Sequence, residues 1–169
     1  MAQRFTSKDT SINREKLPAV FRKASFGSRI IFDYGCGKYT DHIRKYLLGR
    51  YVYLPFDPYN QSEDCNKASR FVLTLASANG DPVDVVCSNV LNVIDDLDTI
   101  QSIADDIQSI TAATGGTAFI TVYEGNRSGI GKQTGKDQYQ RNEPLRNYLR
   151  FFRNATVKNG MIVASAKKC

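Results

Sequence analysis

Four short apolar runs, separated by longer polar and amphipathic stretches, constrain the fold of this chain more than any other feature. They occupy residues 29–33, 51–56, 83–88 and 116–123. Each run has the length and the β-branched or aromatic content of a buried strand. When such strands alternate with helices, they form a parallel sheet with helices on both faces. The sequence therefore predicts an α/β fold of the Rossmann-like, doubly wound type.

Two of the intervening stretches have clear helical patterns. One starts after Thr40, a residue that can cap a helix, and Gly49 can end it. The other starts after Asp95 or Asp96 and keeps a regular apolar stripe on one face. That stripe consists of Leu97, Ile100, Ile103, Ala104, Ile107 and Ile110.

The end of the chain predicts a further helix and a hairpin. Pro144 can open a helix, because its fixed φ suits the first turn. The apolar face of that helix consists of Leu145, Tyr148, Leu149 and Phe152. The dipeptide Asn159-Gly160 separates the apolar runs 155–157 and 161–164, which is a strong hairpin signal. The mostly parallel sheet should therefore end in a C-terminal antiparallel hairpin.

The remaining segments have weaker patterns. We expect residues 1–10 to form a loose arm and residues 11–25 a helix. A short helix near 63–68 and a strand near 71–75 fit the sequence between the second and third apolar runs. Residues 125–141 are polar, basic and rich in glycine, and we expect a loop there.

The length of 169 residues corresponds to one domain. We expect an N-terminal arm and helix over residues 1–28, followed by a ligand-binding domain over residues 29–169. The sequence has no run of about 18 apolar residues that could cross a membrane. Its first residues also lack the apolar stretch of a secretory signal. These features predict a cytoplasmic protein without a membrane partner.

The net charge of +6 indicates contact with nucleic acid or another polyanion, although an ordinary basic surface explains it equally well. None of the four cysteines forms a Cys-x-x-Cys pair, and His42 is the single histidine. A zinc site built from several histidines is therefore excluded, and we expect no metal. Four scattered thiols fit a reducing compartment.

Glycines and acids gather where three of the predicted strands end. The first apolar run leads into Gly35 and Gly37, the second into Asp57, and the third into Ser88 and Asn89. Glycine allows a sharp turn and a close approach of the backbone to a ligand. Asp57 follows Gly37 by twenty residues, the sequence spacing at which an acid binds the hydroxyl groups of a ribose. The pattern predicts a nucleoside-containing cofactor, and the alternative is a tight turn without a ligand.

The glycine loop departs from the dinucleotide signature Gly-x-Gly-x-x-Gly, because Thr40 stands at the last glycine position. Asp33 lies two residues before the first glycine. With that acid, the chain resembles the class I S-adenosylmethionine-dependent methyltransferases from about residue 30 to residue 167. The pieces that carry the resemblance are Asp33-Tyr34-Gly35-Cys36-Gly37, Asp57-Pro58, residues 84–94, and the terminal helix and hairpin. They look most like small methyltransferases of phages and of bacterial DNA-modification loci.

The resemblance implies the class I methyltransferase fold, S-adenosylmethionine as cofactor, and a role for individual residues. It assigns cofactor binding to Asp33, Gly35, Cys36, Gly37, Asp57, Pro58, Ser88 and Asn89. The first four belong to the loop for the methionine end, Asp57 to the ribose, and Ser88 and Asn89 to the surroundings of the sulfonium. The adenine should lie near residues 76–79. Many family members have a further glycine where this chain has Tyr39, which would narrow the methionine pocket or stack on the cofactor.

The methyl acceptor is less clearly indicated. The tetrad Ser88-Asn89-Val90-Leu91 lacks the two prolines and the aromatic residue of the DNA enzymes that methylate amino groups. Cys87 lies in a predicted strand, so we expect a buried, unreactive thiol. The 125–141 segment is either a basic, mobile lid over the acceptor or a solvated loop. The candidates for acceptor contact are Tyr123, Arg127, Lys132, Lys136 and Arg141. The catalytic candidates are Asn89 and, as a general base, Glu124.

Together these features predict an S-adenosylmethionine-dependent methyltransferase, with nucleic acid as a candidate acceptor. One alternative is a non-catalytic protein that binds S-adenosylmethionine or its nucleoside products and serves in regulation or interaction. Tyr39 and the missing acceptor motif favour that alternative. A second alternative, a nicotinamide-dependent dehydrogenase, is disfavoured by Thr40 and by Asp33.

Overall fold

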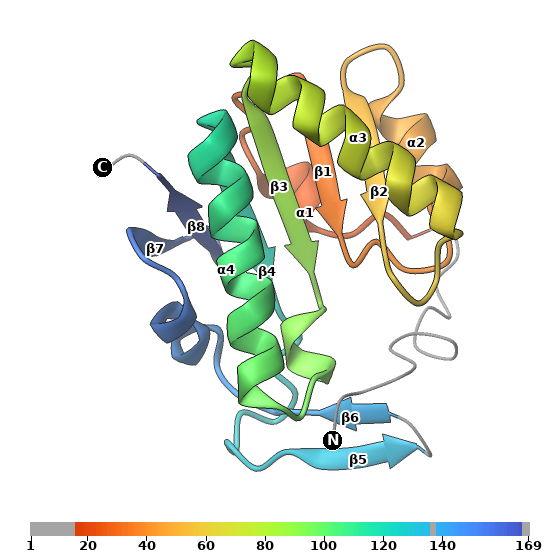
Figure 1. The fold of residues 1–169 in the computed structure, drawn as a ribbon. Helices are drawn as coiled ribbons and strands as arrows, with labels where there is room; N and C mark the ends of the chain where they lie inside the picture. The colour runs from red at the N-terminus through yellow and green to blue at the C-terminus, as the bar shows by residue number, and fades with distance from the viewer. Residues whose placement is uncertain (1–15, 136–137, 167–169) are drawn as a thin grey trace.

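The computed structural model describes residues 16–135 and 138–166. These residues form an α/β fold around a six-stranded sheet with the order β2-β1-β3-β4-β8-β7 (Figure 1). The strands of this sheet are β1 Ile30–Tyr34, β2 Val52–Phe56, β3 Val83–Ser88, β4 Thr117–Thr121, β7 Ala155–Lys158 and β8 Met161–Ser165. The first four are parallel, whereas β8 pairs antiparallel with both β4 and β7. The expected mostly parallel sheet with a C-terminal antiparallel hairpin is confirmed.

Helices cover both faces of the sheet (Figure 1). One face carries α3 Glu63–Asn79, α4 Leu97–Thr114 and the 3₁₀ helix η2 Leu145–Phe151, and the other carries α1 Val20–Lys23 and α2 Asp41–Leu47. Because successive side chains of a strand point to opposite faces, β1 contributes to two cores. Phe32 packs in the core under α3 and α4, and Ile31 packs in the core under α1 and α2.

The clearest sequence signals produce the expected elements. At the start of α4, the side chain of Asp96 accepts a hydrogen bond from the amide of Thr99 at 2.9 Å, and Gly115 ends the helix with a φ of 75°. In the turn between β7 and β8, Asn159 and Gly160 have φ values of 53° and 72°. Two successive positive φ values match the right-handed twist of the strands that the turn joins. Both predictions are confirmed.

The strand expected near residues 71–75 is wrong, because α3 runs without a break through this segment. Ser62 caps this helix by accepting the amide of Cys65 at 3.2 Å. The neighbouring strand β2 lies at the edge of the sheet, and its Pro55 has no N–H for pairing with a further strand. The carbonyl of Pro55 instead accepts the hydroxyl of Ser69, on α3, at 2.7 Å. The sheet therefore ends at β2.

The 125–141 segment contains more order than a loop. Strands β5 Lys132–Gly135 and β6 Gln138–Gln140 form a separate antiparallel hairpin. In Figure 1 this hairpin lies beyond the carboxyl ends of the parallel strands. The prediction of a loop without strands was therefore wrong for this part of the segment.

Three smaller differences concern helices. The structure places α1 within the predicted 11–25 helix, and residues 11–15 lie outside the described part of the chain. Thr40 precedes α2 as expected, but its side chain makes no capping hydrogen bond. The helix expected after Pro144 has 3₁₀ geometry.

None of the helices in the described part of the chain has both the length and the apolar character needed to cross a membrane.

Candidate functional site

The direction of the chain across the sheet reverses between β1 and β3. The chain leaves β1 towards α2 on one face, and it leaves β3 towards the 3₁₀ helix η1 (Leu91–Val93) and α4 on the other. Open α/β sheets bind ligands outside the carboxyl ends of the strands at such a switch point. The two loops touch here, because a Cβ built on Gly35 would collide with the Cγ2 of Val90. They meet at the candidate cofactor site.

The loop after β1 is a compact turn that is held to the end of β2. Gly35 and Gly37 both have a φ of 74°, a backbone conformation that residues other than glycine rarely adopt. The amides of Gly35 and Cys36 donate to the carbonyl of Phe56 at 2.7 and 3.2 Å. The side chain of Gln61 donates to the carbonyl of Gly37 at 2.7 Å. The sharp glycine turn expected from the sequence is therefore present, with Cys36 half-buried inside it.

Asp57 joins the glycine loop to the loop that follows β2. Its buried Oδ2 accepts the amide of Gly37 at 3.0 Å. Its Oδ1 accepts the amides of Tyr59 and Asn60 at 2.9 and 3.0 Å. The side-chain amide of Asn60 reaches both oxygens, at 3.2 and 3.1 Å. A carboxylate has about four acceptor positions, so a ribose hydroxyl would have to replace the Asn60 side chain.

Asp33 is a second buried acid in this region. Its Oδ2 accepts the hydroxyl of Tyr53 at 2.6 Å. Burial raises the pKa of Asp33 to about 7; the charge of Asp57 adds to the rise, and the Tyr53 hydrogen bond opposes it. Neither acid forms an ion pair with a Lys or Arg among the residues that the structure describes. A positively charged ligand would therefore stabilise the ionised form of Asp33.

The end of β3 contributes a polar segment to the same edge of the sheet. Asn89 is exposed with a left-handed φ of 57°, and its amide donates to the carbonyl of Thr121 at 2.8 Å. The Oγ of Ser88 accepts the hydroxyl of Thr121 at 3.0 Å. Cys87 is fully buried, and burial holds the pKa of its thiol well above the ordinary range. The prediction that Cys87 is buried is confirmed.

Pro58 lines a hollow of about 400 Å³ between the end of β2 and the start of α3. The guanidinium of Arg70 covers one wall, 4.3 Å from the centre of the Phe56 ring. Residues 76–79 lie elsewhere, because α3 starts near the carboxyl end of β2 and ends just before β3 begins. The segment expected to contact adenine therefore lies near the amino ends of the strands, whereas Asp57 lies at their carboxyl ends.

A hollow of about 970 Å³ lies at the carboxyl end of β4. It is lined by the segment after β4, which includes Tyr123, Glu124 and Arg127, and by the start of η2 and the β7–β8 turn. The two oxygens of Glu124 accept the amide of Leu145 and the Nε of Arg127, each at 2.6 Å. These contacts, above all the Leu145 amide, hold the pKa of Glu124 below its ordinary value. Glu124 is therefore a weak proton acceptor, and the geometry does not support a general-base role.

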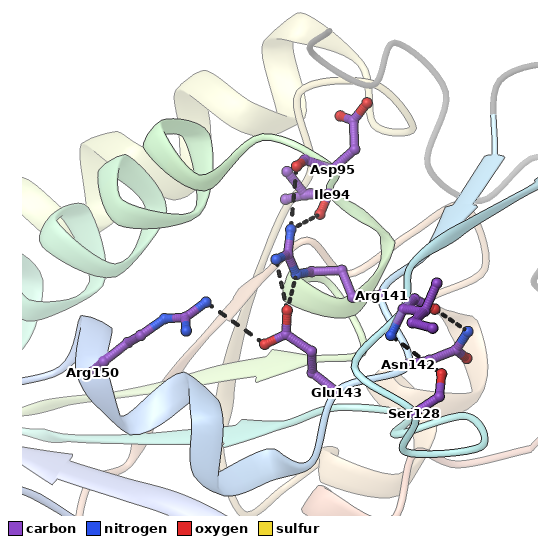
Figure 2. A network of polar contacts seen from close by, with 8 residues as sticks. Ile94, Asp95, Ser128, Arg141, Asn142, Glu143 and Arg150 are labelled. Carbon is purple, nitrogen blue, oxygen red and sulfur yellow. Dashed lines mark hydrogen bonds and ion pairs between the residues drawn. The ribbon is translucent and has the colours of Figure 1, made fainter.

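Arg141 does not belong to a mobile, solvated lid. Figure 2 shows its guanidinium between Glu143 and the chain segment before α4. Its Nη2 lies 2.7 Å from Glu143, and its Nη1 donates to the carbonyls of Ile94 and Asp95 at 3.3 and 3.2 Å. Arg150 lies 3.6 Å from the other oxygen of Glu143. Arg141, a candidate for acceptor contact, is instead buried in an ion pair that fastens the base of the β5–β6 hairpin.

Asn92 is a buried junction to which the sequence assigned no role. Its side chain accepts the amide of Tyr123 at 3.3 Å and donates to Gln140 at 3.2 Å, and its carbonyl accepts the amide of Arg141 at 2.9 Å. Gln140 also donates to the carbonyl of Tyr123 at 2.9 Å. The exit of β4 and the end of β6 are therefore fixed to η1. The partners of Asn92 are distant in sequence, so no local signal reveals this role.

The other candidate residues have simpler places. Lys132 is exposed on β5, the side chain of Arg127 is largely exposed, and Lys136 lies outside the described residues. The described residues contain no group of three or more His, Cys, Asp or Glu that could hold a metal ion.

A scan of the chain against protein-family models and a search of the curated proteins each returned no match.

Proposed function

We propose that this protein binds S-adenosylmethionine at the β1–β3 switch point and acts as a methyltransferase. One observation carries the proposal: Asp33 and Asp57 are buried beside a loop of two positive-φ glycines, without a cationic partner in the described part of the chain. A positively charged ligand gains from both acids. S-adenosylmethionine carries a sulfonium and an ammonium group, whereas a nicotinamide dinucleotide brings an anionic pyrophosphate.

The residues present fit this cofactor best at its methionine end. Asp33, Gly35 and Gly37 lie together at the end of β1, and an ammonium group beside Asp33 would lower its raised pKa. At the ribose end, Asp57 would accept hydroxyl groups in place of the Asn60 side chain. The other partners of Asp57 are backbone amides, so this exchange leaves the loop intact.

The architecture supports the same proposal. A parallel sheet that ends in the antiparallel β8–β7 pair agrees with the class I methyltransferase fold that the resemblance implies. The edge beyond β2 differs, because α3 replaces the strand expected near 71–75. The proposed cofactor position depends on β1 and β3 and not on a strand at that edge.

The bound cofactor would supply a methyl group that its sulfonium already activates. The task of the protein is then to hold the acceptor atom in line with that methyl group, since alignment can contribute much of the acceleration. Asn89 is exposed at the switch point beside β4, and it is our candidate for orienting the acceptor. Glu124 is engaged with Leu145 and Arg127, so we assign it to the wall of the site.

A second candidate function is binding of S-adenosylmethionine without methyl transfer. The engaged carboxylate of Glu124 favours it, because the described β4 exit then offers no strong proton acceptor there. Under this alternative the protein acts in regulation or as an interaction module.

Two measurements test the proposal. Isothermal titration calorimetry should detect binding of S-adenosylmethionine and S-adenosylhomocysteine but not of a nicotinamide dinucleotide. Transfer of a radiolabelled methyl group to host DNA, RNA or protein should then report catalysis. Binding without transfer would favour the second candidate function, and absence of binding would contradict both.

A further inference from the structure

We propose that the hollow at the exit of β4 binds one nucleotide unit of a single-stranded nucleic acid. The base would stack on Tyr123, and its phosphate would lie between Arg127 and Arg146. This β4-exit pocket has a volume of about 970 Å³ and is lined by Val122, Tyr123, Arg127, Leu145, Arg146 and Val157, among others. The inference rests on the proposed function for the pocket's role as acceptor site, whereas nucleotide binding itself can be measured without the cofactor.

The pocket lies on the same edge of the sheet as the candidate cofactor site. β4 is the parallel neighbour of β3, and Ser88 is in register with Thr121 at their carboxyl ends. The amide of Asn89 reaches the carbonyl of Thr121, two residues before Tyr123. An acceptor bound at the β4 exit would therefore approach the cofactor site past Asn89.

Tyr123 presents an aromatic ring to solvent from a fixed backbone. The residue is 63% exposed, although large aromatic rings usually gain stability from burial. Its amide and carbonyl are held by Asn92 and Gln140, at 3.3 and 2.9 Å. Val122 and Leu145 line the same hollow and provide an apolar wall. An exposed ring on a fixed backbone, beside apolar side chains, is a stacking surface for a base.

Positive groups surround this surface. Arg127 and Arg146 are exposed on separate segments, the loop after β4 and the start of η2. The Nη2 of Arg127 forms an ion pair with the Oε2 of Glu124 at 2.5 Å. Arg146 forms no ion pair with any other described residue. The Nζ of Lys23 also lies near the β7–β8 turn, 3.9 Å from the position of a Cβ on Gly160. Cations beside a stacking ring suit a base that carries a phosphate.

The test is fluorescence anisotropy of a labelled oligothymidylate of about 12 nucleotides, repeated over a range of salt concentrations. Tyr123→Ala should weaken binding roughly 5- to 150-fold, because one base loses its aromatic partner. Arg146→Ala should weaken binding and reduce the slope of log affinity against log salt by about one unit, because one phosphate contact is lost. Thymidine monophosphate serves as a competitor. If it displaces the probe as well as unlabelled oligothymidylate does, the ligand is a free nucleotide, and the strand assignment is overturned.

Matched controls use exposed residues of the same types outside the pocket. Tyr46→Ala, on α2, and Arg153→Ala, after η2, should leave binding unchanged. Tyr123→Phe keeps the ring and should bind like the wild type. If Tyr123→Ala does not fold, Tyr123→Leu keeps an apolar side chain without the ring and should show the same weakening.

The outcomes separate this inference from the proposed function. No binding of the oligonucleotide at low salt, or equal weakening by Tyr46→Ala, would overturn the pocket assignment. Tyr123→Ala should bind S-adenosylmethionine like the wild type. Binding of S-adenosylmethionine without binding of the oligonucleotide would contradict the pocket assignment alone. Oligonucleotide binding that requires Tyr123, in a protein that does not bind S-adenosylmethionine, would contradict the proposed function alone.

Discussion

Asp33 has a carboxyl group whose pKa burial raises from 3.8 to about 7. Between these values the native state holds a proton that the unfolded state has released. The contribution of Asp33 to the free energy of unfolding therefore falls as the pH rises from about 4 to about 7, and it is constant above that range. We predict that Asp33→Asn is more stable than the wild type at pH 8 by up to about 4 kcal/mol. The advantage should disappear near pH 4.

Urea unfolding of both proteins between pH 4 and pH 8 measures this effect. The difference between the two proteins is the relevant quantity, because it cancels the titration of other groups. A difference that does not change with pH would show that the Asp33 carboxyl is ionised in the native state throughout this range.

Asp57 has a structural role in addition to its proposed contact with ribose. From its position at the open end of a strand, the sequence predicts that it can be removed without loss of the fold. The structure adds a cost to that removal, because Asp57→Ala leaves the amides of Gly37, Tyr59 and Asn60 without their acceptor. We predict a loss of about 1–3 kcal/mol in the free energy of unfolding, and weaker cofactor binding by roughly 1.5–3 kcal/mol.

Urea unfolding and calorimetry on the same preparation separate the two effects of Asp57→Ala. Asp81→Ala removes an exposed acid just before the start of β3. It is the matched control and should change neither quantity. If stability falls while cofactor affinity is unchanged, Asp57 holds the loop but does not bind the ribose.

The β5–β6 hairpin depends on the buried ion pair at its base. Arg141→Met leaves Glu143 buried with Arg150 as its remaining cationic partner, at 3.6 Å. Breaking one side of a buried pair costs about 3–5 kcal/mol, whereas replacing both sides with apolar residues is often nearly neutral. We predict a large loss of stability for Arg141→Met and recovery of most of it in the double variant Arg141→Met/Glu143→Leu, measured by urea unfolding.

The surface ion pair of Arg127 with Glu124 is the matched control for the hairpin base. The side chain of Arg127 is 70% exposed, so Arg127→Met should change the free energy of unfolding by about 1 kcal/mol or less. If the two single variants lose the same stability, or if the double variant loses as much as the sum of its parts, the buried pair does not fix the hairpin as proposed.

Elements with local signals were predictable from the sequence, and elements defined by distant contacts were not. The stripe and cap of α4 and the Asn159-Gly160 turn depend on neighbours in the chain, so both were recognised. The mixed apolar pattern of residues 71–75 fits a strand as well as a helix, and the structure places this segment in α3. At the β2 edge, Pro55 has no N–H for pairing with a further strand, and its carbonyl accepts the hydroxyl of Ser69, fourteen residues away.

The same distinction holds for the candidate site. The sharp turns at Gly35 and Gly37 and the position of Asp57 follow from where strands end, and the structure brings them together. The burial of Arg141 and the junction at Asn92 depend on partners 46 and 48 residues away in the chain. Such contacts arise only when the hairpin packs against the start of α4, so composition and spacing do not reveal them.

In the whole molecule, the two candidate sites lie on one edge of the sheet and are separated by the end of β3. The glycine loop belongs to β1, and the β4-exit pocket belongs to β4, two strands away in the order β1-β3-β4. We predict that cofactor and nucleic acid bind together. Saturating S-adenosylhomocysteine should therefore leave the anisotropy of a bound oligothymidylate nearly unchanged. Competitive displacement of the oligonucleotide would show that the two ligands share one site.

The most direct test of the account is calorimetric titration of the wild type and of Asp33→Asn with S-adenosylmethionine near pH 7, in two buffers with different ionisation enthalpies. Asp33 has a pKa of about 7 and lacks a cationic partner in the described residues, so binding of a cationic ligand should release part of a proton to the buffer. We predict that the wild type binds with an enthalpy that depends on the buffer, that Asp33→Asn binds more weakly without this dependence, and that a nicotinamide dinucleotide does not bind. Tighter binding of the dinucleotide, or no binding of S-adenosylmethionine, would contradict the account.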